Sequence, residues 1–277
     1  MDWSRSKSIF IFVFLILDLF LYSLYLNRHT EAEKVEILGE ETIEAKLRND
    51  NITYVALPNN IDTAAYLSGK VKNFEEAALP SNRNQKVKVE NENKLIVTLE
   101  KPVKLRNLDD EASYKEFLQS NVSEGASYVL WEIDHEKRVA TFFQRINERT
   151  IYYNINGIVT IYWNEQGEVY LYEQTMLEGL EENEKKENLL SPLQVIQTLY
   201  AKQLLKPNSR ITQMKLGYST LVQLTQTQVF VPTWDIRVES ENGNQEEYFV
   251  DAVEGKVIDV NLDTVNVEEI EEVENRE

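Results

Sequence analysis

The chain has 277 residues, no cysteine and a formal net charge of −18. This length accommodates one membrane anchor and one or two soluble domains, and the lack of cysteine excludes disulfide bonds and a thiol nucleophile. The acidic balance argues against a nucleic-acid partner, because like charges repel. The 9 glycines, 6 prolines and 10% aromatic residues are typical of a folded chain rather than a disordered one.

The first predicted element is a membrane-spanning helix over residues 9–26. As a helix this segment would extend about 27 Å, which matches the apolar core of a bilayer. Fourteen of its residues are Leu, Ile, Phe or Val, each favouring insertion by about 0.3–0.6 kcal/mol, and together they outweigh the roughly 3 kcal/mol cost of the central Asp18. The only small-residue cleavage candidate, residues 30–32, is a poor match, so we expect an uncleaved anchor between a tail (1–8) and a linker (27–34).

The charges beside this segment predict its orientation. Arg5 and Lys7 precede it, whereas Arg28 and Lys34 follow it among acidic residues. The positive-inside rule therefore favours a cytoplasmic N-terminus, and the acidic remainder of the chain is then extracellular.

Asp18 is an ionisable residue in the middle of the apolar segment. Helical spacing places six large side chains on the same face: Ile11, Phe14, Leu15, Leu21, Tyr22 and Tyr25. In one interpretation Asp18 is merely tolerated and is satisfied by Tyr22 or by water. In the other it forms a hydrogen bond to a second membrane helix, as intramembrane ionisable residues usually do. A single-span protein would take that helix from another chain or from a second copy.

Residues 35–148 are predicted to form a first α+β domain. Alternating apolar residues indicate strands, and helical periodicity indicates two helices, of which the second begins near Asp109 or Asp110. The expected helices are 39–50 and 109–121, and the expected strands are 52–58, 64–74, a hairpin at 85–100, 128–134 and 138–147.

Residues 149–264 are predicted to form a second α+β domain, followed by a disordered acidic tail at 265–277. Ser191, Pro192 and Gln194 have the pattern of a helix N-terminus with a capping box, and residues 180–188 are expected to be a charged surface connection. The apolar face of this helix is expected to carry Leu193, Ile196, Leu199, Tyr200 and Leu204. Strands are expected at 149–156, 157–167, 168–177, 211–224, 229–240, 246–252 and 256–262. Helices are segregated from antiparallel strands, which defines the α+β class.

Motifs that carry chemistry are missing from the sequence. It has no P-loop, nucleophile elbow or zinc-protease motif. The two histidines, His29 and His135, lie in polar surroundings typical of solvated positions. Acidic clusters such as 109–111, 181–182 and 246–247 could supply a glycosidase pair, but helix starts and solvated faces explain them equally simply. The sequence therefore predicts a protein that is not an enzyme and that uses no cofactor and no metal.

Several segments together resemble the YycI (WalI) family of Gram-positive bacteria. The N-terminal MDWSRSKSIFI, with Trp3, leads into the L-D-L-F-L at residues 17–21. Later landmarks are Leu216-Gly217-Tyr218, Val231-Pro232-Thr233-Trp234, and the segment 248–252 followed by Gly255. The resemblance covers most of the chain, and its N-terminal motif is the most specific part.

This resemblance implies an accessory regulator of the WalRK two-component system, which controls cell-wall metabolism. The implied partners are the sensor histidine kinase WalK (YycG) and the sister protein YycH, with which the external domains are expected to dimerise. Regulation in the family is attributed to contacts between membrane helices, and Asp18 is our own candidate for such a contact. Two alternatives stay open: an extracytoplasmic binding or inhibitor module similar to PepSY domains, and a cell-wall enzyme that uses paired acids.

Overall fold

The computed structural model describes residues 14–15, 17–18, 21–22, 41–59, 61–75, 84–223 and 227–258. The chain separates into two compact units, Met1–Asn49 and Asp50–Glu277, and each is described by itself.

The first unit contains the helix α2 (Ile43–Asn49). Thr42 begins it: its hydroxyl accepts a hydrogen bond from the Ala45 amide at 3.3 Å, and its carbonyl accepts one from the Lys46 amide at 3.0 Å. The expected helix at 39–50 is thus confirmed over its C-terminal part. Most of the expected membrane segment lies outside the described residues, and among the residues described no helix is both long and apolar enough to cross a membrane.

The described residues of the second unit form one hydrogen-bonded, mostly antiparallel sheet of 14 strands. Its main path runs β10-β2-β12-β11-β7-β6-β8-β9-β4-β3, and β1, β5, β13 and β14 pair with members of this path. The strands are β1 (Thr53–Tyr54), β2 (Thr63–Val71), β3 (Gln85–Glu90), β4 (Lys94–Lys104), β5 (Tyr128–Asp134), β6 (Val139–Ile146), β7 (Arg149–Tyr152), β8 (Ile158–Trp163), β9 (Glu168–Thr175), β10 (Leu177–Asn188), β11 (Arg210–Gln223), β12 (Thr227–Glu239), β13 (Gln245–Asp251) and β14 (Val257–Ile258). The α+β prediction is confirmed for this part of the chain.

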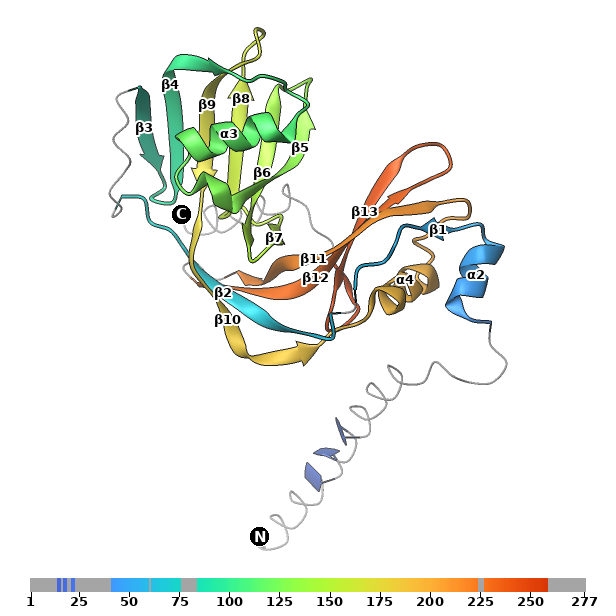
Figure 1. The fold of residues 1–277 in the computed structure, drawn as a ribbon. Helices are drawn as coiled ribbons and strands as arrows, with labels where there is room; N and C mark the ends of the chain where they lie inside the picture. The colour runs from blue at the N-terminus through green and yellow to red at the C-terminus, as the bar shows by residue number, and fades with distance from the viewer. Residues whose placement is uncertain are drawn as a thin grey trace, which may run out of the picture. The chain divides into compact units, whose positions relative to one another are not determined.

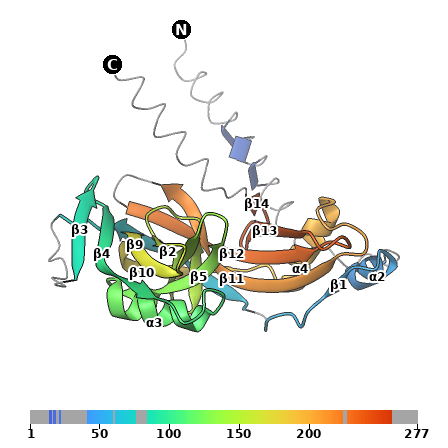
Figure 2. The same cartoon turned by 90° about the horizontal axis from the view of Figure 1, so that it is seen from above.

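One half of the sheet packs against α3 (Glu111–Asn121), which crosses it in Figure 1 and lies along one side of it in Figure 2. Asp110 caps this helix, because its side chain accepts a hydrogen bond from the Ala112 amide at 3.1 Å. Because side chains alternate along a strand, every second side chain of each strand points toward the helix. These side chains form a continuous apolar core with Tyr114 and Phe117 of α3. The expected hairpin at 85–100 and the expected strands of this region are confirmed.

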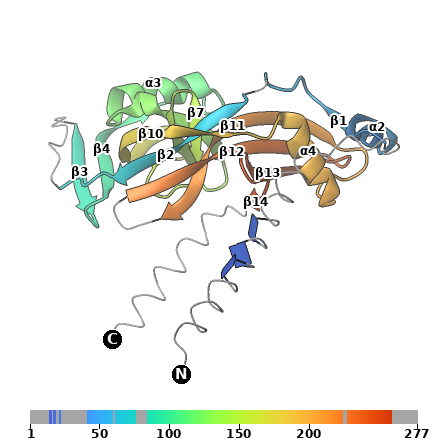
Figure 3. The ribbon, with the colours of Figure 1, turned by 90° about the horizontal axis from the view of Figure 1, so that it is seen from below.

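The other half of the sheet contains β11, β12 and β13, with α4 (Pro192–Ala201) against one face (Figure 3). The predicted capping box is present: the Ser191 hydroxyl accepts from the Gln194 amide at 3.4 Å, and the Ser191 amide donates to the Gln194 side chain at 2.8 Å. The buried helix positions are Pro192, Val195, Ile196 and Leu199, whereas the predicted Leu193, Tyr200 and Leu204 are half-buried. The apolar face is therefore turned slightly from the predicted one.

The expected connection at 180–188 is wrong, because this segment belongs to the edge strand β10. β10 pairs with β2 along its length and is interrupted by two irregularities of register. Most of its side chains are exposed, so it lacks the alternation of apolar residues that marks a half-buried strand. Charged residues and bulges are also what protects an edge from further pairing.

Strand pairing crosses the predicted boundary at residue 148. β2 pairs with β10 and β12, and β4 pairs with β9. The short strand β7 joins the two halves, since it pairs antiparallel with β6 and parallel with β11. The predicted boundary consequently does not separate the strands into two independent sheets.

Candidate functional site

The structure brings the later landmark residues side by side. In the β11–β12 pairing, Leu216 lies opposite Trp234, Gly217 opposite Thr233, and Tyr218 opposite Pro232. All of these positions except Leu216 are buried. Two short motifs that are separated in the sequence are thus paired with each other on adjacent strands.

Because side chains alternate along a strand, the landmarks divide between the two faces of this sheet. Trp234 belongs to the face toward α4, and its Nε1 donates to the carbonyl of Leu190, just before that helix, at 3.0 Å. On the same face, the Tyr248 hydroxyl donates to the carbonyl of Leu204, just after the helix, at 3.0 Å. These two bonds attach both ends of α4 to the sheet.

Gly217 belongs to the opposite face, where the chain approaches β7 closely. A Cβ atom at this position would lie 2.4 Å from the carbonyl oxygen of Thr150 and 2.4 Å from the ring of Tyr152. Neither neighbour is the free end of a flexible side chain, so only glycine fits. Gly217 therefore allows Tyr152 to lie directly on β11.

This second face is polar yet buried. Ser219 and Thr233 are both fully buried, and their hydroxyls are 2.6 Å apart. Asp235 follows on the same row and is 1% exposed. Its Oδ2 accepts a hydrogen bond from the Gln213 side chain at 2.9 Å, whereas its Oδ1 is buried without a hydrogen-bond partner.

Aromatic side chains cover this polar face. Phe143, Tyr152 and Phe249 form a buried cluster, against which Trp131, Tyr153, Ile158 and Ile258 pack. The Trp131 ring lies 4.9 Å from that of Phe143 and 5.6 Å from that of Tyr152, measured between ring centroids. We call the rings of Trp131, Phe143, Tyr152, Tyr153 and Phe249 the aromatic cover.

An ion pair lies at the edge of the aromatic cover. Arg237 donates from Nε to Glu247 Oε1 at 2.8 Å, and its guanidinium lies 4.7 Å from the centre of the Trp131 ring. The Tyr153 hydroxyl donates to Glu247 Oε2 at 3.2 Å and accepts from Trp131 Nε1 at 3.2 Å. Burial, followed by the charge of Glu247, raises the pKa of Tyr153 to about 12, so this hydroxyl stays a donor at neutral pH.

Burial is also the main influence on Asp235. It raises the pKa of this carboxyl from 3.8 to about 7, and the nearby charge of Glu247 adds to the increase. Arg237, Gln213 and Lys215 act in the opposite direction with smaller effects. Asp235 is accordingly a buried carboxyl that takes up or releases a proton near neutral pH.

The predicted residues of the membrane segment are only partly described. Phe14, Leu15, Asp18, Leu21 and Tyr22 are helical and exposed, with Phe14 and Tyr22 at 59% and 60%. Ile11, Tyr25 and Trp3 lie outside the described residues. The contact predicted for this face of the helix stays a prediction.

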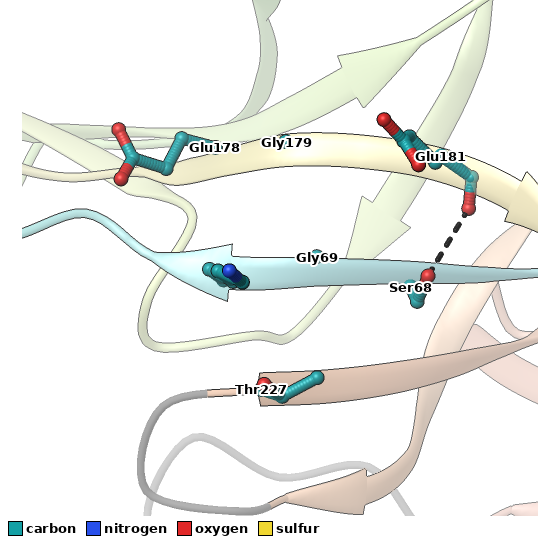
Figure 4. Close-up of a pocket in the computed structure, with 7 residues that line it drawn as sticks. Ser68, Gly69, Glu178, Gly179, Glu181 and Thr227 are labelled. Atoms are coloured by element: carbon teal, nitrogen blue, oxygen red, sulfur yellow. Dashed lines mark hydrogen bonds between the residues drawn. The ribbon is translucent and has the colours of Figure 1, made fainter.

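A polar hollow of about 390 Å³ lies on the outer part of the sheet, where β2 meets β10 and the start of β12 (Figure 4). It contains Lys70, which lies opposite Glu178 in the β2–β10 pairing, and the Ser68 hydroxyl donates to the carbonyl of Glu181 at 3.4 Å. The remaining residues are Gly69, Gly179 and Thr227. This mixture of charges on an open surface offers neither a nucleophile with a base nor a paired acid in a cleft.

His135, one of the two histidines, forms a surface pair. Its Nε2 lies 2.9 Å from Asp109 Oδ1, and the two side chains are 55% and 76% exposed. Within the described ranges, no three His, Cys, Asp or Glu side chains converge as a metal site would require.

Sequence reasoning missed Asp235 and Arg237, and it treated Glu247 only as part of the acidic cluster 246–247, without its pairing to Arg237. The available signal was the segment VFVPTWDIRVE, in which Asp235 interrupts a run of strand-forming apolar residues directly after the landmark Trp234. Aspartate is rarely fully buried, so this signal alone indicates solvent, and only the structure shows that the carboxyl is covered.

Comparison with protein families decides the identity of the chain. The model of the family described as YycI protein matches residues 32–253, which is most of the chain. The chain belongs to the YycI family. Membership ties it to the YycG/WalK two-component system as a regulatory accessory protein.

Other comparisons give weaker similarities. No curated protein sequence matches the chain. Among solved structures, an uncharacterized protein from Eubacterium rectale ATCC 33656 is 11% identical, with 77% of this chain and 92% of that chain covered and a TM-score of 0.46. The C-terminal domain of Bacillus megaterium YpeB is 17% identical, with 71% and 90% covered and a TM-score of 0.40.

Proposed function

We propose that the protein is a membrane-anchored accessory regulator of the sensor histidine kinase YycG/WalK and that it acts together with a YycH-type sister protein. Residues 1–8 lie in the cytoplasm, residues 9–26 span the membrane, and the folded part of the chain lies outside the cell. Contacts of the membrane helix and of the external part both contribute to the assembly.

The observation that carries this proposal is the family match over residues 32–253. The apolar segment that precedes it supports a membrane anchor, because its fourteen large apolar residues outweigh one carboxylate. The polar hollow and the His135–Asp109 pair are both open to solvent, whereas catalytic side chains usually converge in a cleft.

In this mechanism the protein shifts the equilibrium between two states of the kinase and catalyses no reaction. A partner can shift a kinase between two states only if it binds one of them more tightly. A difference of about 1–3 kcal/mol changes activity several-fold to a hundredfold. Asp18 supplies a directional contact for this purpose, because a hydrogen bond between helices in lipid contributes about 0.6–2 kcal/mol.

The test is a gentle-detergent purification of the full-length protein from native membranes, with co-purifying proteins identified by mass spectrometry. Asp18→Leu removes the carboxylate, and the double variant Asp18→Leu/Phe20→Asp restores a carboxylate on a different helix face. We expect the kinase and the sister protein to co-purify with the wild type, and the kinase to be depleted with both variants.

Equal amounts of kinase in all three samples would show that the external part alone carries the binding. Recovery of the kinase in the double variant would show that any carboxylate in the span suffices, which contradicts a contact specific to position 18. If a cell-wall enzyme co-purifies in place of a kinase, the regulatory role is wrong and an extracytoplasmic binding module is favoured.

A further inference from the structure

Asp235 differs from the other buried polar groups of its sheet face in that its hydrogen bonding is incomplete. Ser219 and Thr233 satisfy each other, whereas only one oxygen of Asp235 has a partner, the side chain of Gln213. An ionised carboxylate normally accepts several hydrogen bonds, and a buried one that accepts a single bond is unfavourable. A protonated carboxyl carries no charge, so its burial at this site costs less than that of the carboxylate.

The charged and titratable groups around Asp235 come from four strands. Lys215 lies opposite it on β11, Arg237 follows it on β12, Glu247 faces it from β13, and Tyr152 covers it from β7. Arg237, on its own strand, is already paired with Glu247 at 2.8 Å, and Lys215 is exposed. No cation is therefore dedicated to Asp235 among the residues that surround it in the described part of the chain.

Tyr152 couples Asp235 to the junction of the two sheet halves. This residue ends β7, the short strand that pairs with both β6 and β11. Its ring belongs to the aromatic cover and lies 5.1 Å from that of Phe249, whose residue is the direct neighbour of Asp235 across β12 and β13. A charge on Asp235 attracts water, and because Tyr152 and the aromatic cover lie over this carboxyl, we expect water to enter where β7 and the cover loosen.

We propose that Asp235 is a proton-binding site that controls how firmly β7 and the aromatic cover are held on the β11–β13 sheet. With the proton bound, the carboxyl is neutral and the junction is closed. When the proton leaves to solvent, the carboxylate remains behind and favours an open, hydrated junction. The pKa of about 7 places this change in the physiological range. This property of the folded chain goes beyond the proposed function and does not depend on the identity of the kinase.

The test is hydrogen–deuterium exchange of the β7 segment, residues 149–153, in the full-length protein between pH 4.5 and 8.5. Exchange rates are corrected for their intrinsic dependence on pH. Between the ordinary pKa of an aspartate and about 7, protection should fall by roughly thirtyfold in total and then level off. Asp235→Asn mimics the protonated form and should keep β7 protected at every pH.

Two further variants separate this role from general damage. Asp251→Asn is the matched control, because Asp251 is also buried, but its Oδ1 accepts amide hydrogen bonds from Val253 and Glu254 at 2.7 and 2.9 Å. It should leave the pH dependence of β7 unchanged. Glu247→Gln removes a charge that raises the Asp235 pKa, and the upper end of the transition should move to lower pH.

Unchanged pH dependence of β7 in Asp235→Asn would overturn the proposal, as would flat protection across the whole range in the wild type. If Asp235→Asn does not fold, Glu247→Gln decides, since a transition that stays at the same pH in that variant also contradicts the proposal. The purification experiment on Asp18 is independent of these results, so failure of one leaves the other standing.

Discussion

The two faces of the β11–β13 sheet are buried by different means. Toward α4 the sheet presents Trp234, Ile236 and Val250, each of which is fully buried, and the helix contributes Val195 and Ile196. The polar contacts there attach the helix ends and leave the interior apolar. The opposite face presents hydroxyl, amide and carboxyl groups beneath the aromatic cover.

The comparison teaches that equal burial can have opposite energetic consequences. Removal of apolar area from water stabilises one face whatever the pH. On the other face, stability depends on which polar groups find partners, and Asp235 Oδ1 finds none. We therefore expect the α4 face to supply most of the stability and the polar face to supply sensitivity to protons.

The largest effect is expected on the apolar face. Trp234→Ala removes a fully buried indole and leaves a cavity, so the free energy of unfolding should fall by about 4 kcal/mol at every pH. Chemical denaturation of the full-length protein, followed by circular dichroism, measures this change. Trp234→Phe is the control, because it keeps most of the packing, loses the bond to the Leu190 carbonyl, and should cost about half as much. A marked pH dependence of either loss would contradict the contrast between the faces.

The next effect tests the close approach on the polar face. Gly217→Ala places a methyl group against the Thr150 carbonyl and the Tyr152 ring, so β7 must move and the free energy of unfolding should fall by about 3 kcal/mol. Gly179→Ala is the control: its Cβ meets no atom within 4 Å, and only its positive φ of 60° is unfavourable, at about 1 kcal/mol. Equal losses in the two variants would mean that β7 does not depend on contact with Gly217.

A substitution at Asp235 is expected to increase the free energy of unfolding, by less than the two previous substitutions lower it. Its pKa is raised in the folded state, so its contribution to stability is fully present below pH 3.8 and is lost as the pH rises through about 7. Asp235→Asn removes this loss and should stabilise the protein by about 2 kcal/mol at pH 8, with much less effect at pH 4. Denaturation of both proteins at the two pH values gives the difference. Destabilisation by the same amount at both pH values would show that the carboxyl serves only as a hydrogen-bond acceptor.

The same contrast explains what could be predicted from the sequence. Helix α4 could be predicted from its capping residues, and the strands around α3 could be predicted from their alternation of apolar and polar residues. Both signals lie within a few neighbouring residues of the sequence. β10 could not be recognised, since an exposed edge strand needs no apolar row. The polar face was missed for a related reason: serine, threonine and aspartate on a strand indicate solvent unless it is known that aromatic residues from β5 and β7 cover them.

The pairing of strands that are distant in the sequence was the other part of the fold that could not be predicted. The pairing of β2 with β12 and of β7 with β11 joins segments far apart in the sequence, and no turn or periodic pattern connects them. Gly217 and Trp234 were identified as family landmarks without a physical role. The structure supplies one for each: Gly217 admits Tyr152, and Trp234 holds the segment before α4.

The smallest predicted effect concerns the attachment of α4 to the apolar face. Ser191→Ala removes the hydroxyl that accepts the Gln194 amide, and the free energy of unfolding should fall by about 1 kcal/mol. Ser191→Asp is the control, because a carboxylate at this position still accepts that amide and interacts favourably with the helix N-terminus, so stability should be kept or increased. The loss should not vary between pH 5 and 8, since no titrating group takes part in the wild-type cap. If Ser191→Ala instead altered the exchange of β7, the two faces would be coupled through the sheet, and the independence on which the contrast rests would be wrong.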